Sequence, residues 1–227
     1  IEPFNLQVAR GQIAFHRSIT VFGHNADIDQ TEETVWPDGG TITLPAAALQ
    51  MKVSSGSAND TSAGTGARTV YIEGLDGNYA VVSETVTLNG QTAVNTTNSY
   101  LYVNSFYVLT TGSGGVNAGD INAGTGAVTS GVPAVLYDII ATGYNNRTTG
   151  HYCVPAGYTG YMVEGSLSAG QASGATSACC RGRGARRRAD SGPCRAPLQR
   201  RSACLPAARA PRGRDVPTRR DETHGSP

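Results

Sequence analysis

The sequence predicts an all-β fold: an antiparallel, jelly-roll-like β-sandwich with an extended N-terminal arm and an irregular C-terminal tail. Three observations predict it. Apolar and polar residues alternate in short runs between residues 56 and 110, turn-forming residues separate these runs, and no stretch keeps helical apolar periodicity for more than about two turns. A chain of 227 residues has room for one sizeable core or two small ones.

The region from Gly56 to Thr110 has the pattern of a meander. Val70 and Ile72 place apolar side chains on one face of a first strand, with polar or aromatic residues between them. A second strand is expected from Val81 to Leu88, where the alternation continues. This pattern is typical of a sheet that is buried on one face only.

Turn residues separate the runs of the meander. Asp76-Gly77-Asn78 and Asn89-Gly90 tolerate positive φ at tight reversals, so a hairpin is predicted at each. The third run, Tyr100 to Leu109, is apolar or aromatic at odd and even positions alike. We expect both of its faces to be covered, one of them by a neighbouring subunit, and a bulge at Asn104-Ser105.

Weaker patterns flank the meander. We expect a short strand over Thr41–Leu44, a helical turn or an edge strand over Pro45–Val53 with strand favoured from Leu49, a polar Gly-rich excursion over Thr110–Gly131, a buried strand over Val135–Thr142, and two short strands around a turn within Tyr152–Met162. The pentapeptide AGTGA occurs at residues 63–67 and 123–127, which indicates two equivalent turns.

The segment from Phe22 to Gly40 is predicted as an anchored loop. Its Asx residues are either oxygen ligands for Ca²⁺ or side chains that fix turns; they are Asn25, Asp27, Asp29 and Asp38. Their spacing lacks the Gly and Glu positions of a known calcium loop, so turns are favoured and no metal or other cofactor is expected. Trp36 either closes one end of the core or is exposed at an interface.

Charge divides the chain after residue 178. Residues 1–178 carry five basic and thirteen acidic residues, a net charge of −8, whereas residues 179–227 carry thirteen Arg and four acidic residues, a net charge of +9. We therefore expect an arm over residues 1–22, a β-sandwich body over residues 23–178 and a tail rich in Arg, Pro, Ala and Gly over residues 179–227. An acidic body does not favour nucleic acid.

The tail cannot build a core, because it contains no aromatic residue and no Ile. We expect it to be disordered, or extended on a partner. Four of the five Cys lie there, at positions 179, 180, 194 and 204, without the spacing of a zinc site. The composition is typical of GC-rich DNA translated out of frame, so one hypothesis is a shifted reading frame beyond about Ala178. The alternative is a basic arm that binds nucleic acid.

No set of residues has the pattern of a catalytic site, and no enzymatic activity is expected. The four His, at positions 16, 24, 151 and 224, are scattered, and Cys153 is expected to be a small buried residue. Glu32 and Glu33 would point to opposite faces of a strand. Neither AGTGA is followed by the Lys of a phosphate-binding loop. No apolar run approaches the roughly 20 residues of a membrane span, and no signal peptide is expected.

A set of short blocks runs in order through roughly residues 4–170: FG-N-DID, VW-DGG, S-ANDT-AGTGAR, I-GLD, ETV-LNG and VPAG-TGYM. Together they resemble a family of virion structural proteins of tailed bacteriophages, of the head-decoration or cement type. The resemblance implies a non-enzymatic β-sandwich that decorates or cements the head shell. It also implies further β-type sequence beyond residue 178, and there this chain departs from the family.

The resemblance implies partners as well. They are the major capsid protein and neighbouring copies, with a homotrimer expected on the capsid exterior after synthesis in the host cytoplasm. Nucleic acid, membrane and small-molecule substrates are not expected. Residues expected at these contacts are Phe4, Leu6, Val8, Phe15, Arg17, Ile19, Phe22, Trp36, Tyr102 and Tyr107.

The conformation of the arm and the role of the whole chain each have an alternative interpretation. Phe4, Leu6 and Val8 alternate, so the arm is expected to lie as an extended strand on another protein, or as a terminal strand of the chain's own sheet. The whole chain could instead be a tail, collar or fibre component that binds a host receptor. A carbohydrate-active enzyme on a β-sandwich is a third hypothesis, which the missing acid and base residues disfavour.

Overall fold

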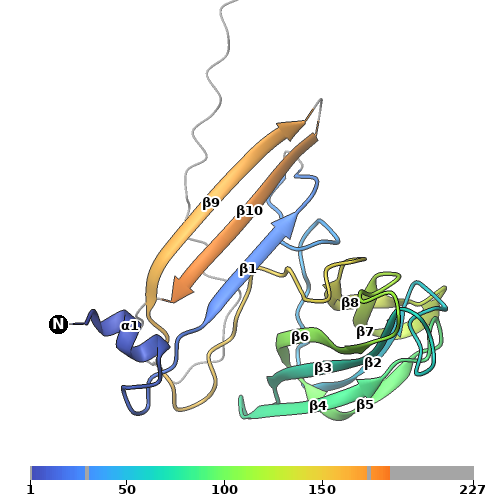
Figure 1. Cartoon of the computed structure of the whole chain (residues 1–227), viewed down its shortest axis with the longest axis horizontal. Coiled ribbons are helices and arrows are strands. Elements are labelled where there is room, and N and C mark those ends of the chain that lie inside the picture. Colours follow the sequence, from blue (N-terminus) through green and yellow to red (C-terminus); the bar gives the residue numbers. More distant parts are fainter. Residues whose placement is uncertain (1, 29–30, 173–174, 185–227) are drawn as a thin grey trace, which may run out of the picture. The chain divides into compact units, whose positions relative to one another are not determined.

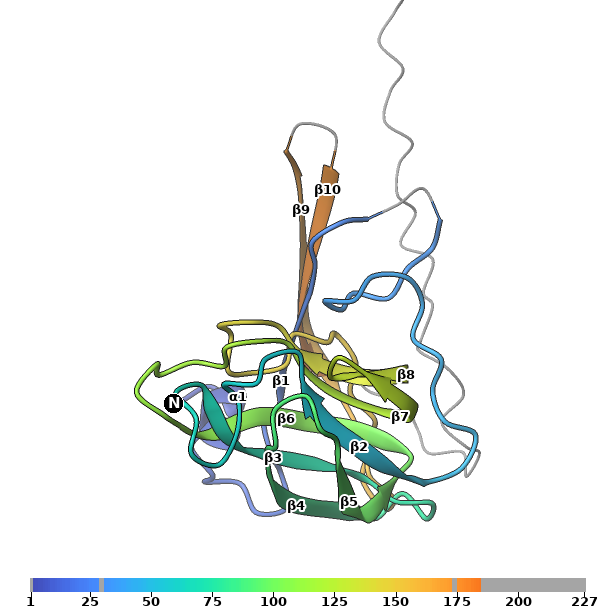
Figure 2. The same ribbon diagram turned by 90° about the vertical axis from the view of Figure 1, so that its right-hand side faces the viewer.

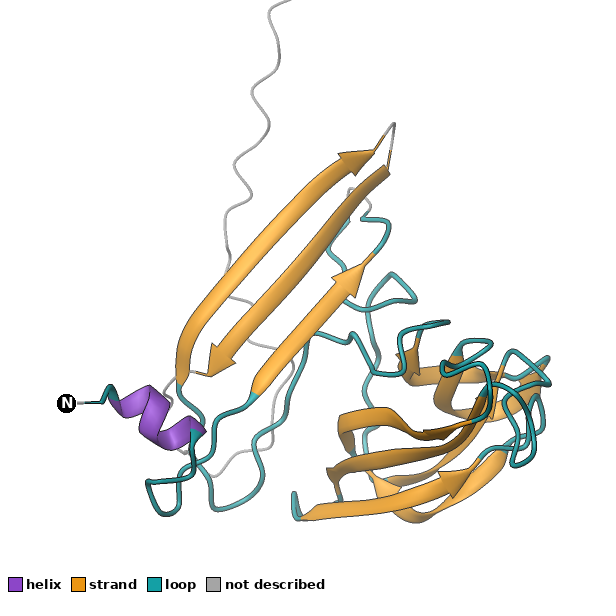
Figure 3. Ribbon diagram, in the orientation of Figure 1, coloured by secondary structure: helices purple, strands orange, loops and turns teal. Residues whose placement is uncertain are grey.

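The computed structural model describes residues 2–28, 31–172 and 175–184, and within these ranges the chain forms one short helix and ten strands (Figures 1 and 3). They are α1 (Phe4–Ala9), β1 (Thr20–Asn25), β2 (Leu49–Ser55), β3 (Ala67–Leu75), β4 (Val81–Thr87), β5 (Val94–Tyr100), β6 (Tyr102–Thr111), β7 (Ile121–Thr129), β8 (Val132–Ile140), β9 (Met162–Ala172) and β10 (Ala175–Gly184). No helix in the described ranges is long and apolar enough to cross a membrane.

The body is an antiparallel β-sandwich, as predicted. One sheet has the strand order β5-β2-β7-β8 and the other β4-β3-β6, so β3 lies between β4 and β6 (Figure 2). Both sheets contribute to one core of fully or nearly fully buried side chains. Its largest fully buried members are Met51, Val53, Val70, Ile72, Leu88, Tyr100, Phe106, Ile121 and Ile140.

The first predicted hairpin is present and the second is not. Asp76 Oδ1 accepts hydrogen bonds from the backbone N–H groups of Asn78 and Ala80, at 2.8 and 2.9 Å, and the chain returns from β3 into β4. Gly90 also turns the chain, with φ of +60°. However, β5 pairs with β2 of the opposite sheet, so the prediction of a hairpin at Asn89-Gly90 is wrong.

The third predicted run is divided at Leu101 into β5 and β6, which lie in different sheets. The predicted bulge is confirmed: Glu73 pairs with Ser105 and Gly74 pairs with Val103, which leaves Asn104 as the extra residue. Both faces of the first half of β6 are buried, also as predicted. The cover on Asn104 comes from residues 145–153 of the same chain, rather than from a neighbouring subunit.

Four other predictions need correction. The Gly-rich stretch after residue 110 contains β7, and Ile121 and Ala123 are fully buried because the glycines around them leave room for close strand packing. The second AGTGA lies inside that strand while the first lies in a loop, so they are not equivalent turns. No strand forms over residues 41–44, and residues 152–161 contain a turn but no strand. The strands predicted from Leu49 and over residues 135–142 are present as β2 and β8.

A third sheet has the order β1-β10-β9 (Figure 1). Antiparallel pairing aligns Thr20 with Arg183 and Asn25 with Ala178. The expected boundary after residue 22 falls inside β1, and the boundary after residue 178 falls inside β10. Residues 179–184 therefore belong to a strand, and the rest of the expected tail lies outside the described residues.

Candidate functional site

The N-terminal segment presents apolar side chains to solvent. α1 has no buried residue, and within it Phe4 and Leu6 are about half exposed, at 57% and 48%. Phe15 is fully exposed, and the ring of His16 meets Phe4 edge to face at 5.7 Å. The prediction of an extended strand over Phe4–Val8 is wrong. On the helix Phe4 and Val8, at i and i+4, share a face, whereas Leu6, at i+2, lies on the opposite side, so the alternation predicted a strand that does not form.

The third sheet has a second group of exposed apolar residues. Met162, Val163 and Leu167 on β9 are each about 60% exposed, and Phe22 on β1 is 42% exposed. Among the described strands β9 pairs only with β10, and it contains no Lys, Arg or Pro. Isolated soluble domains usually protect such a strand with charges or prolines. An open, weakly charged strand is typical of an edge that another chain covers.

Four of the ten expected contact residues line one groove of about 240 Å³, namely Arg17, Ile19, Phe22 and Tyr107. Tyr107 stacks on Tyr71 with ring centroids 5.1 Å apart. Arg17 Nη2 lies 3.9 Å from a carboxylate oxygen of Glu73, a long exposed pair that contributes little to stability. The arm therefore reaches β3 of the same chain at Glu73 and lines a groove together with β6.

Trp36 and Tyr102 are buried, and Val8 is half-buried. Trp36 is only 4% exposed, and its indole N–H donates a hydrogen bond of 2.6 Å to the carbonyl of Gly39. The alternative of an exposed Trp36 at an interface is therefore wrong. Tyr102 packs with Leu75 and Cys153 in a second small core, and the predicted burial of Cys153 is confirmed.

Of the Asx residues that the structure describes in this loop, Asn25 fixes a turn through its side chain. Asn25 Oδ1 accepts the backbone N–H of Asp27 at 3.0 Å, and Asn25 Nδ2 donates to Glu33 at 2.8 Å. Asp29 lies outside the described residues. Among the described residues no group of three or more His, Cys, Asp or Glu is placed to hold a metal ion.

A buried ion pair, which the sequence analysis missed, ties residues 145–153 to the sandwich. Arg147 Nε lies 2.6 Å from Asp138 Oδ2, and both side chains are almost completely buried. Arg147 also donates to the carbonyl of Asn104, and Thr149 donates to Asp138 Oδ1 at 2.6 Å. Burial raises the pKa of Asp138, and the Arg147 charge opposes that rise. The pair joins β8, β6 and residues 145–153. No local sequence motif predicts this ion pair.

A second missed residue is Asp60, which is fully buried in the loop between β2 and β3. Its Oδ1 accepts the backbone N–H groups of Ala67 and Ala118, at 2.6 and 2.9 Å. Its Oδ2 accepts from Ser55 Oγ and from the N–H of Gly119, at 2.6 and 3.0 Å. One carboxylate therefore holds two loops and the end of β2 together. The ANDT block had indicated a resemblance, but not this contact.

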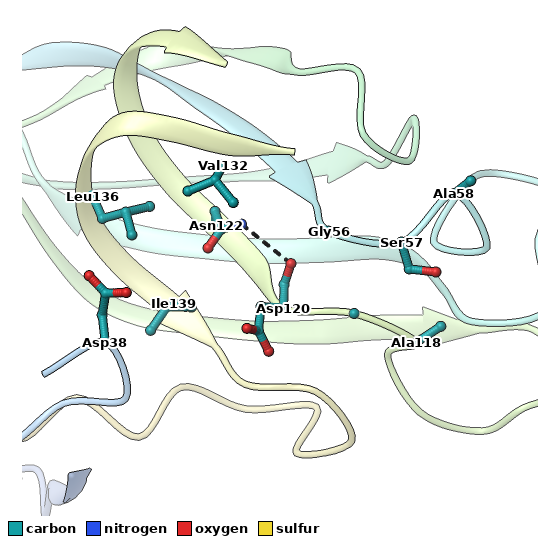
Figure 4. A pocket seen from close by; sticks show the side chains of 11 residues that line it. Asp38, Gly56, Ser57, Ala58, Ala118, Asp120, Asn122, Val132, Leu136 and Ile139 are labelled. Atoms are coloured by element: carbon teal, nitrogen blue, oxygen red, sulfur yellow. Dashed lines mark hydrogen bonds between the residues drawn. The ribbon is translucent and has the colours of Figure 1, made fainter. Parts of the chain in front are cut away.

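A cavity of about 560 Å³ lies between the end of β7, β8 and the loop that carries Asp38 (Figure 4). Asp38, Asp120 and Asn122 are polar residues of its lining. Its aliphatic wall consists of Val132, Leu136 and Ile139. Burial, and then the charge of Asp120, raise the pKa of Asp38. Two carboxyl groups therefore face the same partly enclosed space.

Comparison with protein-family models, with curated proteins and with solved structures found no match. The sandwich differs from the segments α1, the loop at Phe15 and β9 in how its residues are held. The sandwich is held by buried carboxylates, whereas α1, the loop at Phe15 and β9 carry large apolar side chains without a core of their own.

Proposed function

We propose that the chain is a non-enzymatic virion structural protein of a tailed bacteriophage, which decorates and cements the exterior of the head shell. In this role it binds the major capsid protein and neighbouring copies, and a homotrimer is the expected oligomer. The exposed apolar side chains of α1, Phe15 and β9 carry the proposal. The ordered blocks between residues 22 and 162 support the choice of family.

The exposed apolar side chains of α1 and Phe15 can stabilise a complex when a partner buries them. A large apolar side chain that is fully buried on binding contributes roughly 1.5 to 3 kcal/mol. Phe4, Leu6 and Phe15 are already about half exposed or more, so a partner gains this energy without unfolding the sandwich. Decoration of a shell requires such contacts, because the protein must bind an assembled lattice and stabilises it only where it binds.

The buried polar contacts of the sandwich also suit a protein that decorates a shell. Asp60 and the Asp138–Arg147 pair fix the loops around the core through buried, charge-assisted hydrogen bonds. A preorganised body loses little conformational entropy when it binds, so more of the contact energy remains for the shell.

The triple substitution Phe4→Ser, Leu6→Ser and Phe15→Ser tests the proposal. Each side chain loses roughly 1 kcal/mol of contact, so the affinity for empty heads should fall by about 100-fold. Affinity is measured by co-sedimentation with heads that have been stripped of the protein. The thermal midpoint of the free protein should not change, because α1 has no buried residue.

The matched control is Val81→Ser with Tyr144→Ser. Both residues are more than half exposed, but they lie on the sandwich and outside the N-terminal segment. Head binding should survive this change. Equal loss in both variants, or none in the triple variant, would contradict the assigned surface. Binding to tails rather than heads would transfer the chain to the collar or fibre role.

A further inference from the structure

The polar part of the cavity beside Asp38 includes the carboxylates of Asp38 and Asp120, the amide of Asn122 and the hydroxyl of Ser57. Asn122 is 1% exposed, and its amide nitrogen donates to the carbonyls of Gly131 and Asp120, at 2.8 and 3.4 Å. Its Oδ1 accepts no hydrogen bond from the described residues, and Asn122 is one of the residues that line the cavity. Figure 4 shows the amide nitrogen turned toward Asp120, which leaves the oxygen on the other side of the side chain.

The carboxylates at the cavity are only partly used. Asp120 Oδ1 accepts the backbone N–H and the hydroxyl of Thr142, at 2.7 and 2.8 Å, which leaves Oδ2 available. Asp38 forms no ion pair with a described residue and lies in the field of Asp120. Two like charges and an unused amide oxygen in one partly enclosed space favour a positively charged ligand.

We propose that this cavity binds the charged end of an Arg or Lys side chain from a neighbouring protein in the shell. The acceptors would receive its N–H groups, and the wall of Val132, Leu136 and Ile139 would pack along its methylene stem. This inference names the partner chemistry of one contact, and it rests on the proposed function for the source of the side chain.

A metal ion fits the cavity less well. Hard cations such as Ca²⁺ take six to eight oxygen ligands, whereas the described residues place fewer than three carboxylates or other charged ligands together. The aliphatic wall covers one side, where a metal would need oxygen ligands or water. A long side chain that is apolar along its stem and charged at its tip uses both parts of the lining.

Free amino-acid amides can test the site without the shell. The probes are N-acetyl-arginine amide, N-acetyl-lysine amide and, as an uncharged analogue with a similar stem, N-acetyl-norleucine amide. The readout is the NMR shift of the Asn122 side-chain amide and of the Thr142 backbone amide in the full chain. Saturable shifts are expected with the two basic probes and not with norleucine. Asp38→Asn should weaken binding about tenfold, and Asp27→Asn, at an exposed carboxylate outside the cavity, should not.

Each other outcome counts against the site. No saturable shift with either basic probe, equal shifts with norleucine, or displacement of the arginine probe by Ca²⁺ would overturn it. Head binding separates this inference from the proposed function. Wild-type protein that binds heads, with Asp38→Asn binding as tightly, would refute the cation site alone. Wild-type protein that does not bind heads would refute the function and leave the probe result standing.

Discussion

Arg147→Met should lower the free energy of unfolding by about 3 to 5 kcal/mol, because it leaves the Asp138 carboxylate buried without its partner. The same change frees the carbonyl of Asn104, which Arg147 Nη1 contacts at 2.7 Å. Urea unfolding, followed by the fluorescence of the single buried Trp36, gives the free energy directly.

The chain offers a matched control for this ion pair. Arg10 and Glu2 are also 2.6 Å apart, but the Arg10 side chain is 60% exposed. Arg10→Met should therefore cost no more than about 1 kcal/mol. The double variant Asp138→Asn, Arg147→Met removes the unpaired charge and should be more stable than Arg147→Met alone. Equal effects of Arg147→Met and Arg10→Met would show that the buried pair does not hold residues 145–153 in place.

Asp60→Asn should be the second strongly destabilising change, at about 3 to 5 kcal/mol. The carboxylate accepts four hydrogen bonds, three of them from backbone N–H groups. An amide has one acceptor oxygen, and its NH₂ group would face donors that it cannot bond. The backbone of Gly66 packs directly against this carboxylate, since a Cβ atom there would clash with Asp60 Oδ1. Urea unfolding measures this loss as well.

Two smaller variants keep the Asp60 prediction testable if the Asn variant does not fold. Ser55→Ala removes one of the four donors and should cost about 1 kcal/mol. Asp27→Asn changes an exposed carboxylate and should leave stability within about 0.5 kcal/mol. An Asp60→Asn protein within about 1 kcal/mol of wild type would contradict the role assigned to this residue.

Local patterns predicted the strands whose partners are near in sequence. The alternation at Val70 and Ile72 and the turn at Asp76-Gly77 specify a hairpin, because both signals act over a few residues. The turn at Asn89-Gly90 looked the same but sends the chain into the other sheet. Turn chemistry reverses the chain without stating which strand pairs next, so the pattern could not distinguish the two.

The sequence did not predict the buried roles of Asp60 and of the Asp138–Arg147 pair, for a related reason. Asp60 accepts hydrogen bonds from Ala118 and Gly119, which lie 58 and 59 positions later in the sequence. Asp138 pairs with Arg147, which lies in the loop after β8. A single Asp in a polar loop has many ordinary roles, so only the fold reveals which one is buried. Ile121 and Ala123 were missed because the surrounding glycines mask the alternation of β7. The sequence showed that Phe4 and Phe15 are apolar residues of the arm. It did not predict that Phe4 lies in a helix and Phe15 in a loop.

The most direct test of the proposed role uses the particle. The protein is stripped from heads, and the temperature at which heads rupture and release DNA is measured before stripping, after stripping and after adding the protein back at low and high salt. If the protein cements the shell mainly through apolar contacts, stripping should lower the rupture temperature of the heads. Adding the protein back should restore that temperature at both salt concentrations. Unchanged rupture temperature after stripping, or no recovery when the protein is restored, would contradict a role in stabilising the head.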